Sequence, residues 1–222
     1  MNLFAGFQTW LYPWRLEGAK TWATDIVDRP GIDLAIDILD LKLSDIPFEP
    51  GEIDLLVASP DCTAFSKGSI GTHWAGGAKA YVPATDKALN RMLLVHALVG
   101  FIKALRPRYA VIENPIGMLG VLGILDDYER REVWYCHYGE SDRAKPTHLW
   151  GAPFPPGFVT RPTCHNRRPE HPYDCCCRDH DAAPRGAKTG TQGRPKDDRS
   201  FIPFDLASDL MWAVLAEQEA VA

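Results

Sequence analysis

Two segments of the chain combine a reactive side chain with a setting that could present it to a substrate. The first segment, LLVASPDCTAFS at residues 55–66, carries Cys62 directly after an apolar run and Pro60. A thiol in a tight turn behind a buried strand can face a ligand while its backbone is held, and a thiolate is a strong nucleophile. On position alone, a buried structural cysteine is an equally good interpretation.

The second segment, AVIENP at residues 110–115, ends another apolar run in a carboxylate. Pro115 prevents regular continuation of the chain, so Glu113 and Asn114 should stand at the end of a strand. A carboxyl group in that position could bind the edge of a base or transfer a proton. Taken alone, Glu113 could equally be a carboxylate at the start of a helix.

A third group of side chains has the chemistry of metal ligands. Cys177 and His180 lie three residues apart, and Cys164 comes thirteen residues earlier. Such a set could hold a structural zinc ion in tetrahedral geometry, although this spacing is not a standard one. A cysteine-rich loop without metal is the alternative.

The elements around these residues alternate between strands and helices. Apolar runs predict strands at residues 2–5, 21–27, 34–38, 53–58 and 109–112, and helices at residues 10–17 and 86–105, the second amphipathic. This order predicts an α/β fold with a parallel, doubly wound sheet. Ligands bind at the carboxyl ends of the strands in such sheets, where Gly6, Asp25, Cys62 and Glu113 all fall.

The chain changes character at residue 151. Residues 151–200 are rich in Pro, Arg, Cys, His and Gly and show little periodicity, whereas residues 203–218 predict an amphipathic helix that packs back on the core. The net charge is −5, with residues 1–60 acidic. Nine basic residues gather in the later segment: Arg161, Arg167, Arg168, Arg178, Arg185, Lys188, Arg194, Lys196 and Arg199. A nucleic-acid surface, if the protein has one, is therefore expected there.

Composition is that of an ordinary globular protein, with 45% hydrophobic and 24% charged residues. We recognise no signal peptide in the sequence. We also find no apolar run of the roughly 20 residues that a bilayer requires. These features predict a cytoplasmic protein without a membrane partner, whose six cysteines are thiols or metal ligands rather than disulfides.

Taken in order, the motifs resemble those of the DNA cytosine-5 methyltransferases, and among these the small phage-type members. That family has a Pro-Cys loop after one strand, a Glu-Asn dipeptide after the next and an N-terminal Phe-x-Gly loop, here Phe4-Ala5-Gly6. The segments YCHYGESDRAKPTHLWG (135–151), APRGAKTGTQG (183–193) and RSFIPFDL (199–206) extend the likeness over nearly the whole chain. The resemblance implies a Rossmann-like methyltransferase sheet.

The resemblance also implies roles for the reactive residues. Cys62 would add to C6 of cytosine, and Glu113 would hold N3 and the exocyclic amine of the base. Asn114 would shape the pocket, and Lys145 would supply a positive charge. The substrate would be double-stranded DNA with the target cytosine flipped out of the helix.

The methyl donor implied by the resemblance is S-adenosylmethionine. Asp25 would bind its ribose, and Asp37 would lie beside its adenine. The rest of the site would be lined by Phe4, Ala5, Gly6, Ser59 and Pro60. Residues 1–150 would form the cofactor-binding and catalytic core, residues 151–200 a small target-recognition module, and residues 201–222 a helix packing back on the core. The expected protein is a monomer, acting in the host cytoplasm if phage-encoded.

Two residues depart from the family pattern. Asp61 stands where the family has proline before the cysteine, and like-charge repulsion from it would disfavour the thiolate. Gln8 replaces the second glycine of the cofactor loop and would crowd the methionine end of the donor. Alternatives therefore stay open: the same chemistry on RNA or a nucleotide, transfer of another one-carbon group, or a non-catalytic DNA-binding relative.

Trp74, in a Gly-rich loop, is a further candidate for contact with the base.

Overall fold

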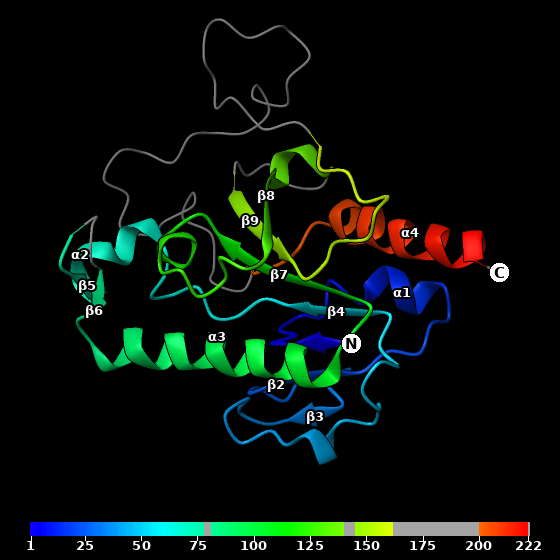
Figure 1. Cartoon of the computed structure of the whole chain (residues 1–222), viewed down its shortest axis with the longest axis horizontal. Helices are drawn as coiled ribbons and strands as arrows, with labels where there is room; N and C mark the ends of the chain where they lie inside the picture. Colours follow the sequence, from blue (N-terminus) through cyan, green and yellow to red (C-terminus); the bar gives the residue numbers. More distant parts are fainter. Residues whose placement is uncertain (78–80, 140–144, 162–199, 222) are drawn as a thin grey trace, which may run out of the picture.

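The computed structural model describes residues 1–77, 81–139, 145–161 and 200–221 (Figure 1). A seven-stranded sheet lies at its centre, with strand order β3-β2-β1-β4-β7-β9-β8. The strands are β1 (Asn2–Leu3), β2 (Ala23–Asp25), β3 (Leu34–Ala35), β4 (Leu55–Ala58), β7 (Tyr109–Pro115), β8 (Glu129–Trp134) and β9 (Pro146–Gly151). A hairpin of β5 (Trp74–Ala75) and β6 (Val82–Pro83) stands apart from this sheet.

Five strands of the sheet run in parallel and bring their carboxyl ends to one edge. β1 pairs with β2 and β4, β2 pairs with β3, and β4 pairs with β7, all in parallel. β9 pairs antiparallel with both β7 and β8. The predicted doubly wound sheet is confirmed, but it is mixed rather than purely parallel, because β9 runs against its two neighbours.

The two faces of the sheet carry separate halves of the core, because side chains alternate along a strand. Leu56 of β4 and Ile112 of β7 face one cluster, whereas Val57 and Val111 face the other. Both central strands are thus apolar on both faces, as expected for strands covered by helices on each side.

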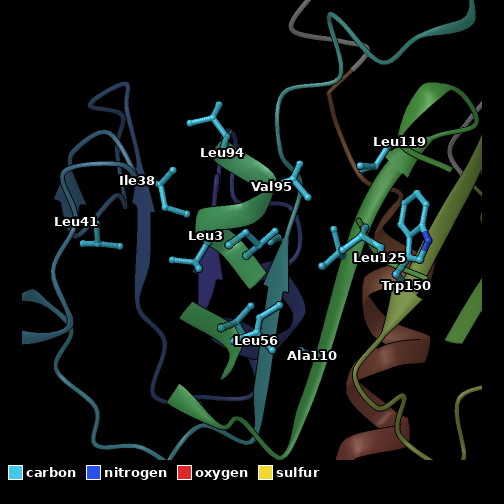
Figure 2. Packing of buried hydrophobic residues seen from close by; sticks show 14 of the residues in the cluster. Leu3, Ile38, Leu41, Leu56, Leu94, Val95, Ala110, Leu119, Leu125 and Trp150 are labelled. Atoms are coloured by element: carbon cyan, nitrogen blue, oxygen red, sulfur yellow. The ribbon is translucent and has the colours of Figure 1, made fainter. Parts of the chain in front are cut away.

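Helix α3 (Asp86–Leu105) covers the first face and has the bounds that the sequence predicts. Its buried side chains recur at helical spacing, and Figure 2 shows Leu94 and Val95 above Leu3, Leu56 and Ala110 of the sheet. Thr85 caps the amino-terminal end of the helix, because its hydroxyl accepts a hydrogen bond from the Ala88 amide at 3.3 Å. It ends at Arg106, which has a left-handed backbone with φ of +47°.

Helices α1 (Tyr12–Leu16) and α4 (Phe204–Val221) cover the other face, side by side (Figure 1). Leu206, Leu210 and Val214 of α4 are buried against Val57 and Val111 of the sheet. Arg161 fastens α4 to the segment after β9: its guanidinium donates to both carboxylate oxygens of Asp209, at 2.9 and 3.1 Å, and to Asp205 at 2.9 Å. Arg161 was expected among the basic residues of a nucleic-acid surface, but its charge is matched inside the fold.

Within the described residues, α3 is long and apolar enough by composition to cross a membrane, contrary to the expectation that no such stretch exists. The reason is that its apolar residues are not confined to one face, since Leu89 and Leu93 are exposed while Leu98 and Ile102 are buried. The buried face packs on the sheet, as in the core helix of a globular domain.

Candidate active site

The turn after β4 holds Cys62 at the carboxyl edge of the sheet. Pro60 is buried, and the Ser59 hydroxyl accepts a hydrogen bond from Trp10 Nε1 at 3.0 Å. The carbonyl oxygen of Cys62 accepts from the amides of Phe65 and Ser66 at 2.9 and 3.0 Å. The backbone on both sides of the thiol is therefore fixed, while the cysteine itself is half-buried and a free thiol.

The end of β7 places Glu113 and Asn114 beside this turn. Glu113 is 4% exposed, and its Oε1 accepts from the Tyr135 hydroxyl at 2.8 Å and lies 3.4 Å from Lys145 Nζ. Asn114 is fully buried and donates from Nδ2 to the Pro60 carbonyl at 2.8 Å. The Asn114 bond ties the glutamate-bearing strand to the cysteine turn, fifty-four residues away in sequence.

A second contact between these segments depends on Gly117. The Met118 amide donates to the Phe65 carbonyl at 2.7 Å, and Ser66 forms an antiparallel bridge with Gly117. A Cβ at Gly117 would lie 2.0 Å from the Phe65 carbonyl oxygen. Glycine is needed here for close approach of two backbones, since its φ of −177° is ordinary extended backbone.

The electrostatic setting of Cys62 is mixed. Burial raises the pKa of its thiol, the ammonium group of Lys145 lowers it, and the carboxylates of Glu113 and Asp61 raise it further; the net direction is upward. Burial and the neighbouring Glu113 also raise the pKa of Tyr135 well above its ordinary value, so its hydroxyl stays protonated and donates. Lys145 Nζ lies 4.4 Å from the centre of the Tyr135 ring.

The loop after β1 contains the predicted cofactor residues. Phe4 and Gly6 have φ of +56° and +50°, and a Cβ at Gly6 would meet nothing within 4 Å. Gln8 adopts φ of +58°, a left-handed conformation that suits the glycine it replaces. Its amide Nε2 donates to the Pro30 carbonyl at 2.8 Å, so this end of the side chain is held by the turn after β2.

The two predicted cofactor carboxylates lie at the end of β2 and just after β3. Asp25 accepts from the Gly6 amide at 2.9 Å through Oδ2 and from the Val27 amide at 2.9 Å through Oδ1. Asp37 accepts from the Leu39 amide at 3.0 Å. Asp25 therefore links the second strand to the loop after the first. Its Oδ1 also pairs with Arg29 Nη1 at 3.6 Å, while Oδ2 keeps a lone pair for a ligand hydroxyl.

Two sequence-based candidates lie elsewhere. Trp74 is 5% exposed, donates from Nε1 to the Ala64 carbonyl at 2.7 Å and stacks on Phe65. The ring thus lies beside the cysteine turn and supports it from below, and its contact with the base stays a prediction. The candidate zinc ligands Cys164, Cys177 and His180 lie outside the described residues.

Two residues of the site escaped the sequence analysis. Tyr135 opens the segment 135–151, but nothing in that pattern marks its hydroxyl as the partner of Glu113. Arg91 donates to Asp61 at 2.7 and 3.0 Å from the middle of α3, where a single arginine gives no recognisable signal. A cavity of about 470 Å³ near Met1, Phe48 and Ile53, at the amino-terminal end of β4, includes none of the site residues.

The fold and site together define a Rossmann-like α/β protein with a cysteine, a buried glutamate and a lysine at the carboxyl edge of the sheet. No family model matches the chain. A protein of Frog virus 3 (isolate Goorha), described as a probable DNA (cytosine-5)-methyltransferase, is 26% identical over 151 residues, which cover 68% of this chain and 68% of that protein. This similarity confirms the resemblance found in the motifs.

Among solved structures, an E. coli prophage protein assigned as a DNA modification methyltransferase aligns with a TM-score of 0.47 and 14% identity. The alignment covers 73% of this chain and 50% of the prophage protein, so this chain spans about half of its length.

Proposed function

We propose that the protein transfers a methyl group from S-adenosylmethionine to C5 of cytosine in double-stranded DNA. The observation that carries the proposal is the joining of the Cys62 turn to the Glu113 strand through Asn114 and Gly117. A nucleophile and a buried carboxyl group held in fixed relation suit a planar substrate that must be attacked on one atom and gripped on another. The similarity to the Frog virus 3 protein supports the same reaction.

The side chains divide the work as follows. The thiolate of Cys62 adds to C6 of the flipped cytosine, which makes C5 electron-rich. Glu113 donates a proton to N3 and accepts a hydrogen bond from the exocyclic amine, so that the negative charge that the thiolate brings to the ring is neutralised at N3. Lys145, 3.4 Å from Glu113, balances the buried carboxylate. Once C5 carries the new group, loss of its proton and departure of Cys62 restore the aromatic ring.

S-adenosylmethionine supplies an electrophilic methyl group when bound, and the residues after β1 and β2 fit it. The space beside Gly6 is open, and Asp25 lies against the same loop with a lone pair of Oδ2 left for a ligand. Asp25 would bind the ribose hydroxyls and Asp37 the adenine end, with Phe4, Ala5, Ser59 and Pro60 lining the site. The amide of Gln8 is held at Pro30, which limits how far it can reach toward the donor.

Incubation with labelled S-adenosylmethionine and unmodified double-stranded DNA, followed by nucleoside mass spectrometry, tests the proposal. We expect 5-methylcytosine from the native protein and none from Cys62→Ala, with donor binding nearly unchanged because the thiol acts on the base. DNA containing 5-fluorocytosine should trap a covalent adduct, since fluorine cannot leave C5 as a proton.

Cys136→Ala is the matched control, because Cys136 is a second cysteine outside any disulfide and lies on another element, the short helix Tyr135–His137. An adduct that persists in Cys62→Ala would overturn the assignment of the nucleophile. Product on RNA or free nucleotides but none on DNA would overturn the substrate.

A further inference from the structure

Asp61, directly before the candidate nucleophile, is bound through both carboxylate oxygens. Oδ2 accepts from Arg91 Nη2 and Nε at 2.7 and 3.0 Å, and Oδ1 accepts from the Thr63 amide at 2.8 Å. Cys62 lies between the residue that supplies this carboxylate and the residue that supplies the amide. A movement of the Asp61 carboxylate would therefore move the cysteine.

The guanidinium of Arg91 is itself fixed. Its Nη1 donates to the Asn90 side chain at 2.6 Å, and its backbone belongs to the rigid helix α3. The side chains of Arg91 and Asp61 are 24% and 31% exposed, and an ion pair so open to solvent contributes little to stability. The ion pair therefore matters more for its effect on the neighbouring Cys62 thiol than for the stability of the fold.

The titratable groups that face Cys62 come from four segments. Lys145 precedes β9, Glu113 belongs to β7, Asp61 belongs to the cysteine turn, and Tyr135, on the short helix after β8, is neutral. Lys145 pairs with Glu113, and Arg91 pairs with Asp61. With both pairs intact the charges balance, whereas without Arg91 two carboxylates would face the thiol against one ammonium group.

We propose that Arg91 is a positioning residue for the nucleophile, which holds the Cys62 turn through Asp61 and cancels a carboxylate that would otherwise oppose the thiolate. The inference rests on the proposed function in so far as Cys62 is the nucleophile. It answers the difficulty that the sequence raises at Asp61: the acidic residue is accommodated by a partner thirty residues away.

The test is the rate at which iodoacetamide alkylates Cys62 across a series of pH values, followed by mass spectrometry of the Cys62 peptide. Four variants are compared with the native protein: Arg91→Met, Asp61→Asn, the double variant, and Lys103→Met as a control on the same helix. Asp61→Asn keeps an oxygen for the Thr63 amide, so it removes charge while preserving the turn.

Arg91→Met should react about threefold to tenfold more slowly at neutral pH, with its profile moved to higher pH by up to about one unit. Asp61→Asn should react at least as fast as the native protein, and the double variant should match Asp61→Asn. An unchanged profile in Arg91→Met would overturn the proposal, as would a double variant as slow as Arg91→Met, since the Asp61 carboxylate would then not be the group that opposes the thiolate.

Alkylation requires neither DNA nor methyl donor. Absence of methyl transfer by the native protein would therefore overturn the proposed function while leaving this result standing.

Discussion

Glu113 shows how much of the site is arranged before a substrate arrives. A carboxylate that is 4% exposed would be costly if unpaired, by several kcal/mol. The Tyr135 hydroxyl at 2.8 Å and the Lys145 ammonium group at 3.4 Å offset that cost. Both partners bind Oε1, so among the described residues Oε2 keeps its lone pairs for contact with a base.

Glu113→Gln should lower turnover about a hundredfold while changing DNA affinity much less, because the hydrogen bonds of a carboxyl group strengthen as the ring becomes charged. Single-turnover methylation and a DNA binding titration would separate the two effects. Glu129→Gln, on the exposed start of β8, is the control and should retain native rates. An equal loss of affinity and rate in Glu113→Gln would contradict a role in the transition state.

Sequence reasoning reaches only part of the site at this scale. Cys62 and Glu113 stand out because each follows an apolar run, and a reactive residue at the end of such a run can be recognised from the sequence alone. Tyr135 and Arg91 reach the site through tertiary packing, from positions twenty-two and thirty residues from their partners. Neither residue type is unusual in its own segment, so no local pattern marks them.

Among the elements, the contact of Gly117 with the cysteine turn is the one most exposed to substitution. Gly117→Ala should lower the free energy of unfolding by about 1–3 kcal/mol, because the added methyl group must displace the Phe65 carbonyl from 2.0 Å. It should also slow methyl transfer, because the displaced turn carries Cys62. Urea denaturation and the methylation assay measure the two effects.

Gly68→Ala is the matched control, since a Cβ there meets nothing within 4 Å. Equal stability of the two alanine variants would show that the turn can relax around Gly117 at no cost.

The elements differ in how far the sequence predicts them. The bounds of α3 follow from its start at Thr85 and its end at Arg106, both local effects. β8 and β9 escape detection because their stability comes from non-local pairing. β8 reads ERREVW and lies at the edge of the sheet, where charged residues are common, and β9 begins with proline. β9 alone reverses the direction of the sheet.

For the whole molecule, the small size of the predicted recognition module, residues 151–200, limits specificity. A bidentate base contact gives about 1–3 kcal/mol of discrimination and needs a rigidly held side chain. Arg161 is occupied by Asp205 and Asp209, which removes one arginine from those expected to contact DNA. The remaining basic residues suit phosphates, which position a protein without reading sequence.

We therefore expect a target of two or three bases, including the methylated cytosine, and binding that weakens steeply as salt rises. Bisulfite sequencing of a methylated plasmid and binding titrations at several salt concentrations measure both. Methylation confined to a palindrome of four to six bases would contradict the size argument.

The bonds between the cysteine turn and the strand end have a consequence for the dynamics of the protein. Asn114 to Pro60 and Met118 to Phe65 are long-range bonds between two segments, and neither segment can open alone without breaking both. The two should open as a single cooperative unit, with similar hydrogen-exchange protection at the amides of Phe65, Ser66 and Met118. Thermal fluctuation would then displace the nucleophile and the base-binding carboxyl group together. A partly opened molecule could therefore neither attack the base nor bind it.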